Sequence, residues 1–182
     1  MEPITLCETG FDLIAEYAAI PIGFEIRSRL KLPDFVEVPE GVRWKDYDMH
    51  LEERPSSLAR RFDVTAWGVH LARQRDIAVG GCIVAWNSAD FDMLEGRCDV
   101  AVIVDLRVRR ELRGRGVGRR LLDCAREWAI QRGCVEMRVE TQDTNVAACR
   151  FYRSLGFELL SVDAAGYGDG SDEAKVIFTR TL

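Results

Sequence analysis

The apolar and polar positions along the chain become regular after about residue 65. Residues 65–73 (TAWGVHLAR) and 77–86 (IAVGGCIVAW) flank a short polar turn, and this pattern predicts an antiparallel hairpin of two strands. Residues 98–108 (CDVAVIVDLRV) are almost continuously apolar, which is typical of a central strand that is buried on both faces.

A helical period follows this strand. Six apolar residues recur at spacings of three and four, so they share one face of a helix that runs to about Arg132: Val117, Leu121, Leu122, Ala125, Trp128 and Ala129. Gly133 is placed to end this helix. In residues 134–142 (CVEMRVETQ) the period changes to alternation, which predicts another strand.

The last part of the chain again predicts a helix followed by strands. Thr144 or Asn145 is a suitable cap for a helix that ends near Gly156. Residues 157–162 and 174–181 predict two further strands.

The first third of the chain carries a weaker pattern. Residues 10–19 predict a short helix, and residues 31–57, with three prolines and mixed polar residues, predict a loop that holds at most a short helix. No segment has the composition of a linker, so we expect one α/β domain over residues 1–182.

The composition excludes several classes of protein. Hydrophobic residues make up 47% and charged residues 30% of the 182 residues, which argues against a disordered or collagen-like chain. No apolar run approaches the roughly 18 residues that span a bilayer, so we expect no membrane partner. The six cysteines show no CxxC spacing and the two histidines lie far from metal-ligand spacing, so we expect reduced thiols, no metal and a cytoplasmic protein.

Charge is distributed unevenly. Between Asp105 and Arg120 lie seven arginines and two acidic residues, whereas the whole chain carries a formal charge of −5. A compact basic spot suits a small polyanion such as a phosphate ester. It suits a nucleic acid poorly, because that needs a basic surface spread over many phosphates. The acidic remainder favours a cationic second ligand.

The segment 113–118 (RGRGVG) joins the apolar strand to the start of the helix. Glycine allows close approach of the main chain to a ligand, and the first N–H groups of a helix have no acceptor within the helix. These features predict an anion site, although a solvated glycine-rich turn would have the same sequence. A P-loop requires Gly-Lys-Ser/Thr where Arg119 and Arg120 stand, and a GxGxxG dinucleotide motif requires glycine at 119.

The pattern RxxGxG of this turn, its helix and strand, and the segment 145–157 (NVAACRFYRSLGF) together resemble the GNAT superfamily of N-acetyltransferases. The resemblance covers about residues 65–163. Within the superfamily the chain is similar to streptothricin acetyltransferases, through Trp86-Asn87, Glu140-Thr141-Gln142 and Lys45-Asp46-Tyr47-Asp48. The resemblance implies a mixed, largely antiparallel central sheet of about six to seven strands that is flanked by helices.

The resemblance also implies acetyl-CoA as cosubstrate. The turn and the residue after it would bind its pyrophosphate: Arg113, Gly114, Arg115, Gly116, Val117, Gly118 and Arg119. Leu106, Arg107 and Val108 would pair with the pantetheine arm through their main chain, and the N–H of Leu106 or Val108 would polarise the thioester carbonyl. Asn145 would contact the pantetheine or serve only as a helix cap.

In the same resemblance Tyr152 is the general acid that protonates the leaving thiolate. A phenol with a pKa near 10 can serve a thiol whose pKa is about 8.5. We expect Tyr152 at the site and its neighbour Phe151 in the core, because adjacent helical residues point about 100° apart. The general base is Glu140 or Asp105, with Asp99 a third option and a water chain an alternative to direct contact.

Four residues are candidates to line the pocket of the acceptor amine: Asp46, Tyr47, Asp48 and Trp86. The first three would otherwise be an acidic, solvated loop, and Tyr167 in the loop after 163 is a further candidate. We therefore expect an N-acetyltransferase that moves an acetyl group from acetyl-CoA to a primary amine by direct attack in a ternary complex. The acceptor is a small cationic molecule such as a streptothricin-type antibiotic, which connects the protein with antibiotic resistance.

Three alternatives remain open. The chain could acetylate a lysine or the N-terminus of a protein, or it could bind acyl-CoA without catalysis. It could also bind nucleic acid through Arg107–Arg120, which the sequence pI of about 5.2 argues against. A homodimer is expected only because dimers are common in the superfamily.

Overall fold

The computed structural model describes residues 2–168 and 170–182, and these residues form two compact units. The first unit comprises the chain up to residue 22, residues 46–137 and residue 182. The second comprises residues 23–45 and 138–181. That the chain forms a single domain stays a prediction.

The first unit is built on four strands that follow the order β1-β4-β5-β6, and each neighbouring pair is antiparallel. The strands are β1 (Ile4–Thr9), β4 (Gly68–Gln74), β5 (Ile77–Ala85) and β6 (Val100–Val108). The predicted hairpin and the predicted central strand are therefore confirmed. The first four residues of β6 are buried, as its continuous apolar run indicated.

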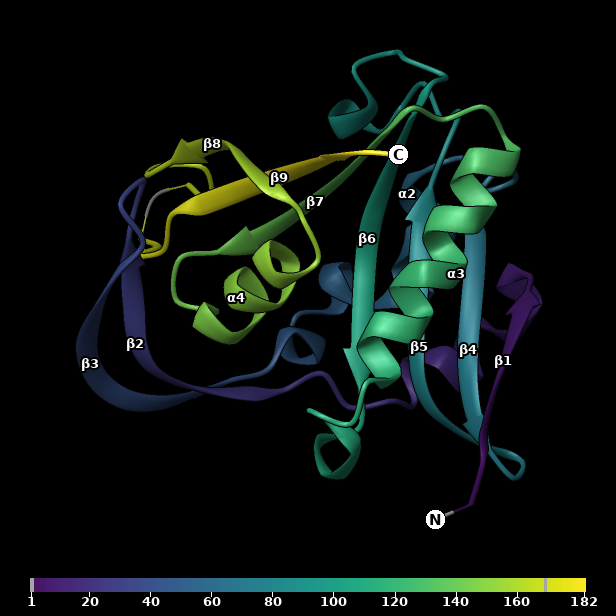
Figure 1. The fold of residues 1–182 in the computed structure, drawn as a ribbon, viewed down its shortest axis with the longest axis horizontal. Coiled ribbons are helices and arrows are strands. Elements are labelled where there is room, and N and C mark those ends of the chain that lie inside the picture. Colours follow the sequence, from purple (N-terminus) through teal and green to yellow (C-terminus); the bar gives the residue numbers. More distant parts are fainter. Residues whose placement is uncertain (1, 169) are drawn as a thin grey trace. The chain divides into compact units, whose positions relative to one another are not determined.

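Helices cover both faces of these strands. The long helix α3 (Val117–Gln131) crosses β4, β5 and β6 on one face (Figure 1). The short helix α1 (Ile14–Ala18) packs on the other face, where Tyr17 and Ile20 are fully buried. The remaining helical pieces are one-turn segments: α2 (Leu58–Arg61), η1 (Phe11–Leu13), η2 (Tyr47–Met49), η3 (Leu51–Glu53), η4 (Pro55–Ser57), η5 (Asp92–Leu94) and η6 (Arg110–Leu112).

Two adjacent glycines of β5 show how tightly α1 packs. A Cβ added at Gly81 would overlap the Tyr17 ring, with Cδ2 at 2.7 Å, and would lie 3.0 Å from the main-chain oxygen of His70. A Cβ at Gly80 would instead lie 3.1 Å from the flexible end of Leu121 on the α3 face. At Gly80 the main-chain oxygen of Arg107 would also be near, at 3.2 Å. The α1 face is the less able to adjust, because its contacts are shorter and involve a rigid buried ring.

We predict that Gly81→Ala lowers the free energy of unfolding by about 2 kcal/mol, since overpacking a core typically costs 1–3 kcal/mol. Gly80→Ala is the matched control and should cost less than half as much. Urea unfolding followed by circular dichroism measures both. Equal losses for the two variants would contradict the packing described for α1.

The second unit contains a hairpin and three further strands. The hairpin consists of β2 (Phe24–Lys31) and β3 (Val36–Lys45), which pair with each other in antiparallel orientation. The other strands follow the order β7-β9-β8, with bounds β7 (Glu136–Gln142), β8 (Glu158–Asp163) and β9 (Lys175–Thr181). Helix α4 (Val146–Ser154) begins after Asn145, whose side chain accepts a hydrogen bond from the N–H of Ala148 at 3.2 Å.

The structure corrects the expectation for residues 31–57. The whole of β3 lies in this range, where the sequence predicted a loop. Pro39 suggested a break, but it stands on a strand of a two-stranded sheet, where a missing N–H is tolerated. The strand is largely exposed, so it lacks an apolar run that would indicate it. No element had been predicted for β1, which is an edge strand with mixed side chains.

The orders β1-β4-β5-β6 and β7-β9-β8 together contain seven strands, and helices flank them. The predicted α/β fold class, with a mixed and largely antiparallel sheet, is therefore confirmed. None of the helices within the described residues has both the length and the hydropathy to cross a membrane.

Candidate functional site

The glycine-rich turn leads from β6 through η6 into the first turn of α3. Gly116 is the N-cap residue of α3 and has φ of 82°, and Gly114 has φ of 72°. Both values fall in the left-handed region, which L-amino acids with a side chain enter only at a cost. A Cβ at either position would meet nothing within 4 Å. Glycine is therefore needed here for the path of the backbone and not for space inside the protein.

Helix α3 starts at Val117, so the N–H groups of its first turn lack acceptors within the helix and lie at the positive end of its dipole. The residues of the turn, 113–116, are exposed. A glycine path that curves around exposed helical N–H groups is the arrangement that binds phosphate groups through the main chain. The structure thus brings residues 113–119 together as the sequence predicted.

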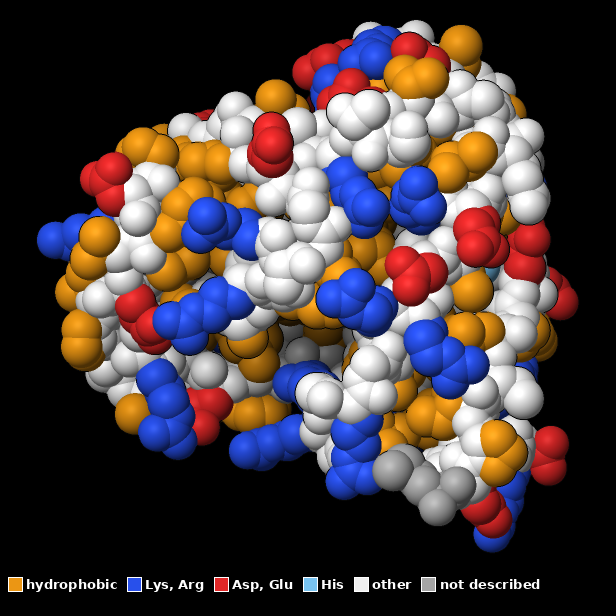
Figure 2. Space-filling model, in the orientation of Figure 1, with side chains coloured by type: hydrophobic (Ala, Val, Ile, Leu, Met, Phe, Trp, Pro, Cys, Tyr) orange, Lys and Arg blue, Asp and Glu red, His pale blue; other side chains and the backbone are white. Residues whose placement is uncertain are grey.

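Arginine side chains surround this turn. Arg113 donates from Nε to the carbonyl of Val108 at 2.9 Å, and Arg109 donates to the carbonyl of Ala78 at 2.9 Å. Donation to a carbonyl leaves the positive charge intact. Burial and then the neighbouring Arg110 lower the pKa of Arg113. Figure 2 shows Lys and Arg side chains gathered around the ends of β6 and α3 where the turn lies.

The end of β6 presents alternate amides to its two edges. The N–H of Arg109 donates to the carbonyl of Val79 on β5 at 2.8 Å. Because amide direction alternates along a strand, the N–H of Arg107 also faces β5, whereas those of Leu106 and Val108 face the opposite edge. Leu106 and Val108 are the two residues whose N–H groups the family resemblance implies for the thioester carbonyl.

Asp105 lies in a buried network of the first unit. Its carboxylate accepts from Arg107 at 2.8 Å (Nε) and 2.6 Å (Nη2), and from the Tyr17 hydroxyl at 2.5 Å. The Asp105 side chain is only 11% exposed. Burial, and then the Asp105 charge, raise the pKa of Tyr17 well above its usual value. A carboxylate with both oxygens engaged in this way is poorly placed to take a proton from an incoming amine.

Asp46 and Asp48 belong to the same unit. The side chain of Asp46 caps η2 by accepting from the N–H of Asp48 at 3.0 Å. Asp48 in turn forms an ion pair with Arg107 at 3.1 Å. The structure therefore connects the predicted amine loop with the end of β6 through the side chain of Arg107. No local sequence pattern indicates this connection, because Arg107 and Asp48 are 59 residues apart in the chain.

Trp86 is not brought beside this loop. It follows Ala85, which pairs with Val102, whereas Arg107 pairs with Gly81 five residues further along β6. That separation is about 17 Å along the strand. The indole N–H of Trp86 donates to the carbonyl of Cys98 at 2.7 Å.

Glu140 lies on β7 in the second unit. One of its oxygens accepts from the Tyr167 hydroxyl at 3.1 Å, and the other is 3.5 Å from the Lys175 ammonium. Tyr167 also accepts from the side-chain amide of Gln142 at 2.8 Å. The Glu140 side chain is 27% exposed. The structure thus places Tyr167 next to this candidate base, which the sequence could suggest only from the loop's composition.

Tyr152 on α4 is the more buried of the aromatic pair, with 6% exposure, while Phe151 is half-buried. The expectation that Phe151 is the core residue of this pair is wrong, because Tyr152 is the more buried of the two. The Tyr152 ring packs against Phe157 and Phe178, with ring centroids 5.6 and 6.4 Å apart. Its catalytic role is a separate matter and stays a prediction, as does a pantetheine contact of Asn145.

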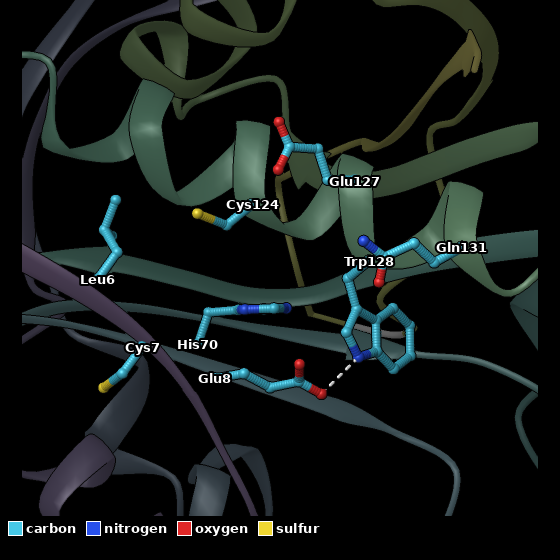
Figure 3. A pocket seen from close by; sticks show the side chains of 8 residues that line it. All are labelled: Leu6, Cys7, Glu8, His70, Cys124, Glu127, Trp128 and Gln131. Carbon is cyan, nitrogen blue, oxygen red and sulfur yellow. Dashed lines mark hydrogen bonds between the residues drawn. The ribbon is translucent and has the colours of Figure 1, made fainter.

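A pocket between β1, β4 and the later half of α3 is lined by other residues of the first unit (Figure 3). Its lining includes His70, Cys124 and Trp128, the last of which donates to Glu8 at 2.8 Å. Cys124 is seven residues into α3, about 10 Å from its first residue. None of the predicted site residues lines this pocket. Within residues 2–168 and 170–182, no cluster of three or more possible metal ligands is found.

The comparison with protein families gives a clear result. The family model described as "Acetyltransferase (GNAT) family" matches residues 30–157 of this chain. The chain therefore belongs to the GNAT acetyltransferase family. The match includes β6, the glycine-rich turn, α3 and α4, which are the elements described above.

Individual relatives match over shorter stretches. Streptothricin acetyltransferase of Escherichia coli is 39% identical over 69 residues, which is 38% of this chain and 40% of the relative. Streptothricin acetyltransferase A of Bacillus subtilis shows the same identity and coverage, and thialysine N-epsilon-acetyltransferase of Bos taurus is 28% identical over 88 residues, 48% of this chain and 51% of the relative. The chain thus spans about two fifths to one half of the length of these relatives.

Solved structures show the same fold over the whole chain. A Bacillus anthracis protein in complex with acetyl coenzyme A superposes with a TM-score of 0.80 at 23% identity, covering 99% of both chains. Nourseothricin acetyltransferase superposes with a TM-score of 0.75 at 21% identity, covering 98% of both chains. At these identities the likeness supports the fold.

Proposed function

We propose that the protein is an N-acetyltransferase that transfers an acetyl group from acetyl-CoA to a primary amine of a small cationic molecule. The observation that carries this proposal is the arginine-ringed turn at the start of α3, with Gly114 and Gly116 in left-handed conformations. Membership of the GNAT family and the acetyl coenzyme A bound to the B. anthracis neighbour support acetyl-CoA as the cosubstrate.

The turn fits the diphosphate of this cosubstrate. Both glycines leave open space where a side chain would stand, so phosphate oxygens can approach the main-chain N–H groups of residues 114–119. The arginines around the turn add positive charge without requiring a metal ion. The amides of Leu106 and Val108, which face away from β5, would bind the pantetheine arm and the thioester oxygen.

In the proposed reaction the nitrogen lone pair of the amine attacks the thioester carbon. For this attack the ammonium first gives one proton to a base. The N–C bond then forms, the C–S bond breaks, and the coenzyme A thiolate takes a proton from the Tyr152 phenol. The second proton lost by the nitrogen restores the phenol, directly or through water. Most of the rate gain would come from holding the two substrates together and from amide donors at the developing oxyanion. A primary amine with a pKa near 10.4 arrives protonated, so a base is needed at neutral pH.

We propose Glu140 as the base, because Asp105 is held by Arg107 and Tyr17. Glu140→Gln is expected to lower kcat/KM for the amine up to about a hundredfold at pH 7, the lower end of the range for a general base. The loss should shrink as the pH rises toward the amine pKa, because more of the amine is then neutral without help. A pH profile of kcat/KM measures this. An Asp105→Asn variant that is as stable as wild type but loses more activity than Glu140→Gln would contradict the assignment.

We propose a streptothricin-type antibiotic as the acceptor, since the E. coli and B. subtilis relatives are named streptothricin acetyltransferases. The test is release of free thiol from acetyl-CoA with streptothricin, spermidine or a lysine peptide. The proposal expects turnover with streptothricin at the highest kcat/KM. Preference for the peptide would indicate a protein acetyltransferase, and tight acetyl-CoA binding without turnover would indicate a binding module. Steeply salt-dependent binding to duplex DNA would instead support a nucleic-acid partner. Cytoplasmic location and a homodimer remain predictions.

A further inference from the structure

Arg107 is fully buried, which is unusual for a guanidinium group. Desolvation by burial lowers its pKa, but the hydrogen bond and charge of Asp105 outweigh this, so its pKa is raised overall. Its partners are Asp105, Asp48 at 3.1 Å and the carbonyl oxygen of Ile20 at 2.9 Å. Burying such a charge is unfavourable unless its donors are satisfied, and here three different parts of the first unit satisfy them.

The two carboxylates of this network are held unequally. Asp105 accepts two short bonds from Arg107 and a third bond from Tyr17, and its side chain is 11% exposed. Asp48 accepts from Arg107 at 3.1 to 3.4 Å, and its side chain is 25% exposed. Arg54 donates from Nε to the main-chain carbonyl of Asp48 at 2.6 Å. Among the side chains of the network, one guanidinium binds two carboxylates, which leaves one negative charge in excess. That charge resides mainly on Asp48, at the accessible end of the network.

We infer that Arg107 is a positioning residue that orients the Asp48 carboxylate as a receptor for a second ammonium group on the acceptor. This inference rests on the proposed function. Arg107 holds Asp48 from its buried side, and Asp46 fixes the local turn by bonding to the N–H of Asp48. The same strand end carries the amides proposed for the thioester. One amine of the acceptor would bind at Asp48 while the other attacks the thioester at the strand end. The enzyme would therefore prefer a diamine to a monoamine of equal length.

The experiment compares 1,5-diaminopentane with 1-aminopentane as acceptors, because the two differ by one ammonium group. Wild type is expected to show at least a tenfold lower KM for the diamine. Asp48→Asn should raise the diamine KM about tenfold relative to the monoamine KM, so that the preference for the diamine is lost. Asp92→Asn, which removes one exposed carboxylate from η5, is the matched control and should keep the wild-type preference.

The Arg107 variants test positioning. Arg107→Met should remove the diamine preference as Asp48→Asn does, and Arg107→Lys should restore part of it, because an ammonium retains the charge but not the two parallel bonds. If Arg107 were purely structural, its replacement would raise the KM values for the diamine and the monoamine by the same factor. That factor would grow as the unfolding midpoint falls. If Arg107→Met does not fold, the diamine preference of Arg107→Lys and of Asp48→Asn tests the inference instead.

The possible failures are distinguishable. Transfer to both amines with no diamine preference, or a preference that survives Asp48→Asn, overturns the inference and leaves the proposed function standing. No acetyl transfer to either amine or to streptothricin overturns the proposed function itself.

Discussion

Replacing Tyr152 by phenylalanine is expected to lower kcat about a hundredfold or more, the range typical of losing a general acid. The coenzyme A thiolate would then leave without a proton donor, while the ring would still fill its place against Phe157 and Phe178. The affinity for acetyl-CoA should change by no more than about threefold. Steady-state kinetics with saturating amine, together with calorimetric titration of acetyl-CoA, measures the two quantities.

Phe151→Leu is the control for this experiment, because it changes the adjacent aromatic residue of the same helix. It should lower the unfolding midpoint more than Tyr152→Phe does, yet keep kcat within about threefold. A Tyr152→Phe enzyme with wild-type kcat would show that another group protonates the thiolate. The burial of Tyr152 would then have a structural explanation alone.

The second large effect is expected at the glycine-rich turn. Gly116→Ala should weaken acetyl-CoA binding about a hundredfold, which corresponds to about 2.7 kcal/mol. A side chain at φ of 82° costs about 1–2 kcal/mol, and displacement of one amide from a phosphate oxygen loses a charge-assisted bond of about 1.5–3 kcal/mol. The dissociation constant from calorimetry is the measured quantity.

Gly133 provides a closely matched control at the other end of α3. It has φ of 81°, and a Cβ there would also meet nothing within 4 Å. Gly133→Ala therefore introduces the same backbone strain without touching the turn. It should lower stability as much as Gly116→Ala does while leaving acetyl-CoA affinity unchanged. Equal affinity losses in the two variants would mean that strain, and not contact with the cosubstrate, causes the effect.

Much of the fold could be predicted from the sequence where one local pattern decides the structure. The β4–β5 hairpin has a polar turn between two apolar runs, and α3 has a regular apolar face closed by Gly133. The glycine-rich turn at the start of α3 was predictable for the same reason, because a strand, the turn and a helix start are contiguous in the chain. The hairpin of β2 and β3 was not, because its side chains are mostly exposed and Pro39 suggested a loop.

The environment of the candidate catalytic groups could not be predicted in this way. Asp105 is engaged by Tyr17, which is 88 residues away in sequence, and Arg107 contacts Asp48, 59 residues away. Such partners depend on how distant segments pack, and one sequence carries no periodic signal for them. The burial of Tyr152 likewise depends on Phe178 of β9, which packs beside it.

One comparison tests the central claim most directly: calorimetric titration of wild type and Gly116→Ala with coenzyme A and with pantetheine, which lacks the diphosphate and the nucleotide. If main-chain amides of the turn bind the diphosphate, wild type should bind coenzyme A at least a hundredfold more tightly than pantetheine. Gly116→Ala should lose most of that difference while its affinity for pantetheine stays unchanged. Equal binding of the two ligands by wild type, or an unaltered difference in the variant, would contradict the account.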